Sequence, residues 1–393
     1  MYDVIVVGGR CAGAATALLL ARQGHRVLVL ERARFPSDTL STLYIHQPGV
    51  DRLARWGVLE EVRATGCPPL RRVSLSGPGL RLEGPAPVWG AAEGGLAPRR
   101  YALDAILARA AARAGAEFRD GCSVTGLLWE GGAVAGVRYT TPRGGTDQAR
   151  ARLVVGADGR NSTVARLVGA PYLRDDGRLT VALYTYWSGL PMDGLGLYSA
   201  QGAGAALVPT QDGLALVNVQ LPRDTPGLTR ESARRAYLAG ALRACPDLAE
   251  PLAAARQEDR LFRCTDLPNF FRRAHGPGWA LVGDAGHHKD PCGAHGISDA
   301  FAQAELLAGC LAEAVDDPEL RAKALRRYAE ERDRRWTPPY EFNLALARLT
   351  PTESHLEVLR QGETDPLFRD RVFRALAGLP DEDLPDGEPT ADG

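Results

Sequence analysis

The chain opens with a strand–turn–helix–strand pattern, and this pattern limits its fold more than any other feature. Residues 4–7 are a continuous run of Val and Ile, as a strand buried on both faces requires. A glycine-containing turn leads into an Ala- and Leu-rich segment at 14–23, which Gly24 ends. Residues 27–30 form a second apolar run. The pattern predicts a βαβ unit and therefore an α/β fold with parallel strands.

The turn, Gly8-Gly9-Arg10-Cys11-Ala12-Gly13, predicts a nucleotide site in spite of one departure. Gly8 permits the tight turn, and Gly13 lets the helix pack close to the strand, so that a pyrophosphate can lie on the helix N-terminus. Arg10 occupies the place of the usual middle glycine, and we expect its side chain to leave the phosphate path. Glu31 ends the second strand, where a carboxylate accepts hydrogen bonds from ribose hydroxyls.

Two later segments have the same strand-to-turn arrangement. Asp158-Gly159 follows an apolar run at 153–156, and Gly283-Asp284 follows another that begins at Trp279. Each of these turns alone is common in proteins that bind no nucleotide there. Their order and spacing, taken with the first turn, predict one nucleotide site assembled from three distant parts of the chain.

The middle of the chain differs in character. LTVALYTYWSGL and GAALVPTQDGLALVNVQL, within residues 179–221, predict long antiparallel strands joined by glycine-containing turns. Helices are expected at 52–63, 103–114, 231–256 and 297–314 and after Pro318, and antiparallel strands at 115–139. We therefore expect a discontinuous α/β domain at 1–72, 100–175 and 265–330, an inserted sheet domain at 73–99 and 176–264, a helical segment at 331–380, and a disordered tail at 381–393.

Composition restricts the partners and the compartment. The 393 residues carry a formal net charge of −1, so no nucleic acid is expected as a partner. Seven cysteines, without a CxxC pair, predict a reducing compartment. Because no signal peptide precedes the first strand and no apolar run approaches ~18 residues, we expect a cytoplasmic protein without integral membrane association. His287 and His288 are adjacent without a nearby third ligand, so we expect no metal site.

The three turn segments together resemble the glutathione-reductase-type flavoproteins of the para-hydroxybenzoate hydroxylase class, which includes geranylgeranyl reductases and flavin halogenases. The resemblance covers roughly residues 1–345 and implies a Rossmann-type FAD-binding domain with an inserted antiparallel-sheet substrate domain. It also implies the residues that contact FAD: Gly8, Cys11, Ala12, Gly13, Glu31, Arg32, Arg100, Asp158, Gly159, Asp284, Gly296 and Ile297.

The sequence departs from the class pattern at two places. Members of the class usually have P-x-x-G-Q-G in the late motif, where this chain has Pro291-Cys292-Gly293-Ala294-His295-Gly296. The middle motif normally reads D-G-x-x-S-x-x-R, but position 165 is Ala and the arginine follows at Arg166. The helix that begins near Gly296 is expected to point its N-terminus at the flavin ring, where its dipole stabilises a reduced, anionic flavin.

The resemblance leaves several activities open. Halogenases of the class depend on a lysine in the N-terminal half and on a W-x-W-x-I-P segment, whereas this chain has only Lys289 and Lys323 and lacks the segment. Prenyl reductases carry Cys-Gly-Gly where this chain has Ser41-Thr42-Leu43. We favour an FAD-dependent monooxygenase that uses molecular oxygen, and NADPH or NADH as reductant, on a small aromatic or natural-product-like substrate. Reduction or dehydrogenation of C=C bonds is the alternative, and a non-catalytic flavin-binding protein is a further one.

Four side chains are the candidates for chemistry and substrate contact. His46 and His295 are the candidate catalytic residues, because histidine moves protons near neutral pH and both positions are expected beside the flavin. Tyr184 and Tyr186 alternate with Trp187 on a predicted strand, so they share one face, which we expect to line a dry substrate pocket. The alternative, in which these two tyrosines only pack against helices, carries equal weight.

Overall fold

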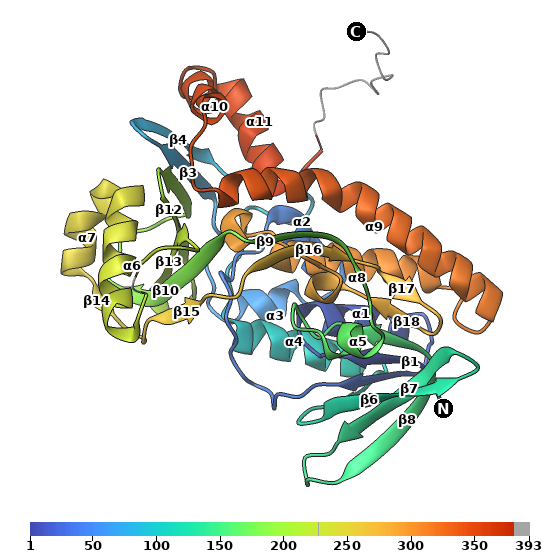
Figure 1. The fold of residues 1–393 in the computed structure, drawn as a ribbon. Coiled ribbons are helices and arrows are strands. Elements are labelled where there is room, and N and C mark those ends of the chain that lie inside the picture. The colour runs from blue at the N-terminus through green and yellow to red at the C-terminus, as the bar shows by residue number, and fades with distance from the viewer. Residues whose placement is uncertain (227, 381–393) are drawn as a thin grey trace, which may run out of the picture.

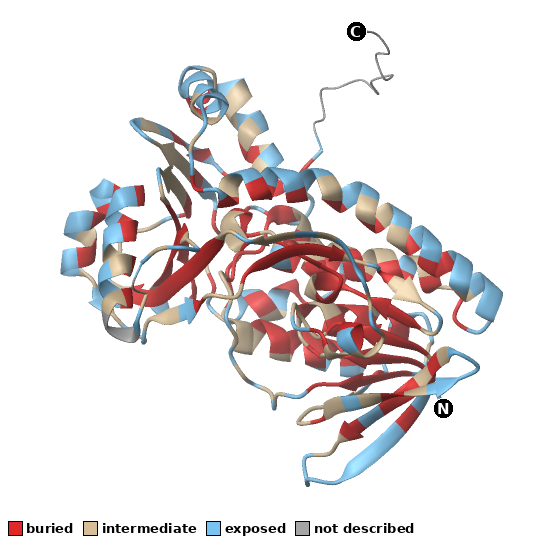
Figure 2. Ribbon diagram, viewed as in Figure 1, coloured by how far each residue is buried: buried red, intermediate tan, exposed pale blue. Residues whose placement is uncertain are grey.

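The computed structural model describes residues 1–226 and 228–380, so the tail predicted to be disordered lies outside the described residues (Figure 1). The fold is mixed α/β, as the sequence predicts. The fold contains three sheets. Most buried residues lie in their strands and on the helix faces that pack against them (Figure 2).

The first sheet holds the βαβ unit. Its order is β17–β18–β8–β1–β2–β5, and Val7 of β1 lies opposite both Leu30 of β2 and Gly156 of β8, which in turn lies opposite Leu281 of β18. Because these four strands are parallel, their carboxyl ends meet at one edge. The bounds are β1 (Tyr2–Val7), β2 (Val27–Leu30), β5 (Glu117–Arg119), β8 (Thr146–Gly156), β17 (His275–Gly276) and β18 (Trp279–Leu281).

The two faces of the first sheet are covered differently. Val4 and Val6 face a layer of helices that share one apolar cluster: α1 (Cys11–Arg22), α2 (Gln47–Arg55), α3 (Leu59–Arg63), α4 (Arg100–Arg113) and α8 (Gly296–Leu311). Ile5 and Val7 belong to a second cluster with the antiparallel ribbon β6 (Ser123–Glu130), β7 (Ala133–Thr140) and β8, and with α5 (Thr163–Leu167). Alternation along β1 thus fills both cores.

The second sheet has the order β14–β10–β13–β12–β11–β3–β4, with β15 also paired to β10. One face of this sheet packs on α6 (Arg230–Ala244), the 3-10 turn η2 (Pro246–Leu248) and α7 (Ala249–Ala254). The other face packs on the part of the molecule that contains the first sheet. The strands are β3 (Arg72–Gly77), β4 (Leu80–Pro85), β10 (Thr180–Ser188), β11 (Leu195–Ala200), β12 (Ala203–Pro209), β13 (Leu214–Pro222), β14 (Arg256–Gln257) and β15 (Phe262–Cys264).

A small third sheet and the C-terminal helices complete the fold. β9 (Tyr172–Arg178), β16 (Pro268–Arg272) and β19 (His287–His288) pair antiparallel. The long helix α9 (Pro318–Ala347) runs along both halves of the molecule (Figure 1). α10 (Glu353–Thr364) and α11 (Pro366–Ala377) place Leu359 and Phe373 against Val73 and Leu82 of the second sheet.

Two predicted helices are interrupted. The helix expected at 52–63 is divided between α2 and α3, because the chain turns at Gly57, whose φ is +69°. The helix expected at 231–256 stops at Ala244. Cys245 is extended because it precedes Pro246, and a 3-10 turn, α7 and the first residue of β14 follow.

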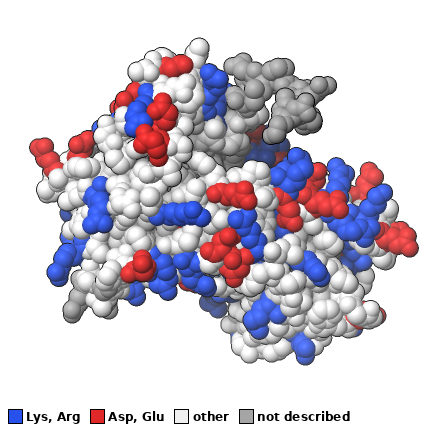
Figure 3. All heavy atoms as spheres, turned by 45° about the horizontal axis from the view of Figure 1, so that its top comes forward, with Lys and Arg blue, Asp and Glu red and all other residues white. Residues whose placement is uncertain are grey.

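Surface charge and helix hydropathy give two further observations. On the face in Figure 3, basic and acidic side chains are intermixed. Ion pairs join Glu331 to Arg334 and Arg335 on α9. None of the helices in the described part of the chain combines the length and the hydropathy needed to cross a membrane.

Candidate active site

The three turns expected to form one site are in contact at the carboxyl edge of the first sheet. A Cβ added to Gly8, whose φ is +95°, would lie 2.5 Å from the carbonyl oxygen of Ala157, in the middle turn. A Cβ added to Gly283 of the late turn would lie 2.9 Å from the Cβ of Ala12. The fold therefore brings segments from the start, middle and end of the chain together, as their order predicts.

The start of α1 can receive a phosphate. A Cβ on Gly13 would lie 1.8 Å from the carbonyl oxygen of Gly8, so only glycine permits this approach of helix to turn. Arg10 is the N-cap, and its side chain makes no capping hydrogen bond. The backbone N–H groups of Cys11, Ala12 and Gly13 begin the helix, and groups in this position have no acceptor within the helix. They suit an anionic group.

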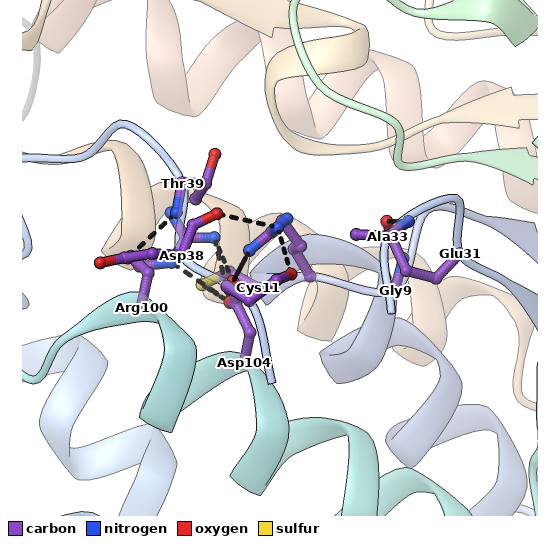
Figure 4. Close-up of polar contacts among 10 residues, drawn as sticks. Gly9, Cys11, Glu31, Ala33, Asp38, Thr39, Arg100 and Asp104 are labelled. Carbon is purple, nitrogen blue, oxygen red and sulfur yellow. Dashed lines mark hydrogen bonds and ion pairs between the residues drawn. The ribbon is translucent and has the colours of Figure 1, made fainter. Parts of the chain in front are cut away.

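Arg10 directs its side chain to the neighbouring helix. Its Nη1 donates to Oδ2 of Asp104 on α4 at 2.6 Å, and its Nη2 donates to the Ser37 hydroxyl at 3.0 Å. Asp104 also accepts from Arg100 at 3.0–3.2 Å and from the Cys11 thiol at 3.3 Å (Figure 4). The Asp104 side chain is wholly buried between two guanidinium groups. Burial lowers the pKa of Arg100, but the charge of Asp104 holds it above its ordinary value.

Glu31 lies at the end of β2 against the first turn. Its Oε2 accepts from the Gly9 N–H at 2.7 Å and its Oε1 from the Ala33 N–H at 2.8 Å, and the residue is 4% exposed (Figure 4). The next residue, Arg32, is exposed. Each carboxylate oxygen has a second lone pair, so Glu31 can also accept from a ribose while it fixes the turn.

Two further aspartates are predicted at the site, Asp158 and Asp284, and their carboxylates have different contacts. Asp158 accepts hydrogen bonds from the Ser162 hydroxyl at 2.5 Å and from the Thr163 N–H at 2.6 Å, so its carboxylate holds the start of α5. Gly159 follows with a φ of +79°. Asp284 lies partly exposed in the late turn, and its charge contributes to the raised pKa of Arg100. Asp284 is thus the carboxylate that faces the assembled site.

The start of α8 is a second helix N-terminus at the site. His295 is its N-cap without a capping side-chain bond, Gly296 is exposed and Ile297 is 7% exposed. Ala294 has a φ of +55°, which is the left-handed region, at the place where the class pattern has glycine. This position thus has a backbone conformation that glycine adopts more readily than alanine.

Side chains from α9 and β10 hold this turn. Asn343 accepts from the Gly293 N–H at 3.1 Å and donates to the Asp290 carbonyl at 2.8 Å. The Thr180 hydroxyl donates to Oδ2 of Asp290 at 2.6 Å. The turn is therefore fixed by elements from both halves of the molecule.

The two candidate catalytic histidines lie face to face beside this turn. The rings of His46, at the start of α2, and His295 stack with centroids 4.1 Å apart and planes 8° from parallel. Nε2 of His46 lies 3.0 Å from the Gly293 carbonyl oxygen, which can only accept, so Nε2 carries the proton and Nδ1 is the free acceptor. The backbone N–H of His46 donates to the Ser298 hydroxyl at 3.0 Å.

Burial keeps both imidazoles neutral. It lowers the pKa of His46 to about 4, against a smaller opposing effect of the bond to Gly293. The pKa of His295 is also well below its usual range, first because of burial and then because His46 and Lys289 lie nearby. At neutral pH both rings are uncharged, so the pair supplies no positive charge to the site.

Tyr184 and Tyr186 lie on the face of the second sheet that meets the turn. They belong to one apolar cluster with Ala294, Leu43 and other residues of the first domain. Tyr184 stacks on Phe262 with centroids 5.0 Å apart. Trp187 lies on the opposite face, as alternation predicts, and donates to the Tyr237 hydroxyl at 2.9 Å.

The guanidinium of Arg99 packs against the ring of Tyr186, within the aromatic group of Tyr184, Tyr186 and Phe262. It lies 3.9 Å from the ring centroid of Tyr186 and donates to Asp38 at 2.8 Å. Burial raises the pKa of both tyrosines. The tyrosines therefore remain protonated and present an uncharged surface.

Several residues that build the site are not predictable from the sequence, or leave only a weak signal there. Asp104 follows Arg100 by four residues on α4, a spacing that favours an ion pair, but the helix expected from the sequence begins at 103 and so does not include Arg100. Asn343 and Ser298 left no such signal, since their partners are set by tertiary packing. Within residues 1–226 and 228–380, no group of His, Cys, Asp or Glu is arranged to hold a metal ion.

Comparisons with known proteins agree with this geometry. A family model described as the FAD binding domain matches residues 1–338. The 6-methylpretetramide 4-monooxygenase of Streptomyces rimosus is 31% identical over 356 residues, which cover 84% of this chain and 80% of that protein. Digeranylgeranylglycerophospholipid reductase 2 of Methanothermobacter thermautotrophicus is 28% identical over 388 residues, covering 96% of this chain and 94% of its own.

Solved structures share the fold. The flavin-dependent brominase Bmp2 matches with a TM-score of 0.82 and 21% identity, covering 96% of this chain and 93% of that one. At this identity the likeness shows the fold alone.

Proposed function

The chain belongs to the FAD-binding-domain family, and from this premise we propose that it is a monooxygenase acting on a small, uncharged aromatic or natural-product-like substrate. It is an FAD-dependent oxidoreductase by its family. The observation that carries the finer proposal is the apolar cluster that joins Tyr184 and Tyr186 to Ala294, directly beside two neutral histidines. Oxygen transfer needs such a dry surrounding next to the flavin. The resemblance to a monooxygenase over most of the chain supports it.

The donor groups at the carboxyl edge fit FAD. We assign Gly8, Cys11, Ala12 and Gly13 to the pyrophosphate, since the turn is closed to any side chain at Gly13 and the helix start has no capping side chain. We assign Glu31 and Arg32 to the adenosine end. Asp284 is assigned to the ribityl chain. Arg100 and the turn at Asp158-Gly159 are assigned to the middle of the cofactor. The N–H groups of Gly296 and Ile297 are assigned to the flavin ring.

Bound FAD, reduced by NADPH or NADH, supplies the electrons that activate molecular oxygen. The residues of the chain orient the substrate, exclude water and move protons. Nδ1 of His46 is free to accept a proton, and His295 is partly exposed on the side of the turn, so each ring can accept a proton separately. Tyr184 and Tyr186 are assigned to the substrate pocket.

Reduction of a C=C bond is the second candidate, and one observation favours it. Leu43 is buried with a φ of +66°, at the place where prenyl reductases of the class have a glycine. The Ser41 hydroxyl accepts from the Leu43 N–H at 3.0 Å and stands where those enzymes have a cysteine. The loop thus has a left-handed residue at the place of that glycine, but it lacks the thiol.

One experiment separates the two candidates. The FAD-loaded protein is supplied with NADPH or NADH and a panel of neutral phenols, alkenes and amides, in air and under strict anaerobiosis. A monooxygenase incorporates isotopically labelled oxygen into its product and forms none without oxygen. Product formed anaerobically, with two added hydrogens, would support the reductase instead. The seven free cysteines support a cytoplasmic location for this reaction.

A further inference from the structure

Asn218 on β13 is a buried amide that the protein leaves without a partner. It is 0% exposed, and among the described residues neither its Oδ1 nor its Nδ2 finds a hydrogen-bond partner. Two residues further along the strand, Gln220 is 3% exposed, and its Nε2 is likewise unpartnered in the described chain. Buried polar groups in folded proteins are nearly always bonded, so two such amides on one strand need an explanation.

Other buried asparagines of this protein follow the rule. Asn269, also 0% exposed, donates to the Gly177 carbonyl at 3.2 Å and accepts from the Asp290 N–H at 2.7 Å. Asn343, 2% exposed, is bonded through both amide atoms. These two stabilise turns. Asn218 is as deeply buried, but its amide forms no hydrogen bond within the described part of the chain.

The register of the second sheet shows which way Asn218 faces. Residues directly opposite one another project to the same face. Asn218 lies opposite Tyr184 of β10 and Ala206 of β12, so it shares the face that carries Tyr184 and Tyr186. That face meets the turn at Ala294. The amide is therefore on the side of the sheet where the flavin ring is expected.

The side chains around the two amides are small or apolar. Gln220 lies opposite Ala182 and Gly204 in the register. Within β10, β12 and β13 no residue in register on this face is charged. Two guanidinium groups border the region: Arg99 is paired with Asp38 at 2.8 Å, and Arg160 lies 4.0 Å from Asp266. On these strands the face is therefore polar chiefly through its two amides, and Nε of each bordering guanidinium is also without a partner among the described residues.

We propose that Asn218 and Gln220 form the polar subsite of the substrate pocket and bind a neutral group that has a hydrogen-bond donor next to a carbonyl oxygen, as in a carboxamide on an aromatic ring. The unpartnered atoms fix this pattern. Oδ1 of Asn218 requires a donor, whereas Nδ2 of Asn218 and Nε2 of Gln220 both require acceptors. A primary carboxamide supplies two N–H donors, one of which can reach Oδ1 of Asn218, and a carbonyl oxygen with two lone pairs.

The aromatic part of the ligand has a matching place. Tyr184 is opposite Asn218 and stacks on Phe262, and Tyr186 is two residues further along β10. A planar ring lying along these side chains would carry its amide to Asn218. A carboxylate is disfavoured, because it offers no donor to Oδ1 of Asn218. This inference rests on the proposed function, since it assumes that the pocket takes an organic substrate.

The first test compares stability. Leucine has nearly the shape of asparagine, so Asn218→Leu removes the unpartnered amide without opening space and is expected to raise the melting temperature of the FAD-loaded protein by ~2 °C or more. Asn269→Leu is the matched control, and it should lower the melting temperature because it breaks two bonds. A fall for Asn218→Leu like that of Asn269→Leu would show a structural role and overturn the proposal.

The second test measures binding to the oxidised, FAD-loaded protein through the change in flavin fluorescence. The probes are naphthalene-2-carboxamide, 2-acetylnaphthalene, which only accepts, and 2-naphthoate, which is charged. Wild type should bind the carboxamide best and the carboxylate least. Asn218→Leu should weaken carboxamide binding at least ~10-fold and binding of the ketone by less, since the ketone uses fewer of the amide groups.

Three results would overturn the assignment. The first is that Asn218→Leu binds the carboxamide as well as wild type does. The second is that wild-type protein binds none of the probes. The third is that Asn218→Leu loses affinity for FAD together with its affinity for the carboxamide. The last would mean that the amides face the pyrimidine edge of the flavin, which has a similar donor and acceptor pattern. Because these measurements need neither reductant nor oxygen, they are independent of whether the enzyme proves to be a monooxygenase or a reductase.

Discussion

Arg10 and Asp104 form an ion pair of 2.6 Å between the first glycine turn and α4, and Asp104 is shared with Arg100. The pair explains how a long charged residue can stand where a glycine is usual. Its side chain is drawn to α4, and its charge is balanced there. The turn therefore keeps its backbone shape while the chain gains a contact between two helices.

This pair predicts unequal effects of two substitutions. Arg10→Gly leaves Asp104 paired with Arg100 and should change the free energy of unfolding by less than about 1 kcal/mol. Asp104→Asn leaves two guanidinium groups without their buried counter-charge and should cost about 3–5 kcal/mol. Denaturant unfolding of both variants measures the difference. Equal losses would mean that Arg10 depends on contacts other than Asp104.

Glu31→Ala should weaken FAD binding roughly 10- to 100-fold, because a charge-assisted bond to ribose contributes about 1.5–3 kcal/mol. The measurement is titration of the apoprotein with FAD, with circular dichroism to verify the fold. Glu130→Ala, at the exposed end of β6, is the control and should bind FAD as wild type does. If Arg10→Gly lost more affinity for FAD than Glu31→Ala, Arg10 would itself bind the phosphates.

Because the backbone at Ala294 is left-handed, replacing this alanine by glycine should change stability in the opposite direction from the same replacement within a helix. Ala294→Gly should stabilise the protein by up to about 1 kcal/mol, because glycine adopts a φ of +55° without steric cost. Ala300→Gly, within α8, should destabilise it by about 0.5–1 kcal/mol. Thermal unfolding of the two variants provides the measurement. Destabilisation by both would show that the Ala294 methyl group is needed for packing.

Stability should fall as the solution becomes acidic. His46 has a folded pKa of about 4 against 6.5 in the unfolded chain, so the unfolded state binds more protons between these values and stability decreases as pH falls through this window. The loss from His46 alone is about 3 kcal/mol. Denaturant unfolding at pH 7 and pH 4.5 should show a smaller decrease for His46→Gln. An unchanged decrease would assign the effect to His287 and His295, whose pKa values are also lowered.

Two substitutions should uncouple reductant consumption from product formation. His46→Ala removes a ring from the stack beside the cofactor turn, and Tyr184→Phe removes a hydroxyl from the proposed pocket. Both should release hydrogen peroxide while NADPH or NADH is still consumed, because water reaches the site. Tyr139→Phe, in the core on the other face of the first sheet, is the control. Loss of flavin reduction itself in His46→Ala would place His46 in the redox step.

The sequence predicts the parts of the site that depend on local backbone shape. Gly8, Gly13 and Glu31 could be assigned because each follows from a strand end and a fixed spacing. The two histidines could be singled out by type, but their stacking could not, since it depends on how α2 packs against α8. The unpartnered state of Asn218 is likewise a property of the assembled sheet. The helix break at Pro246 was readable from the sequence, because the residue before a proline avoids helical geometry.

Asn343 has a consequence for where this protein can be divided. The segment matched by the family ends at residue 338, yet the side chain that fixes Gly293 and Asp290 lies five positions beyond it. A chain cut at that boundary would contain every motif of the family and would leave the late turn without its support from α9. The contacts that hold the late turn therefore extend past the segment that the family model matches, into the last turns of α9.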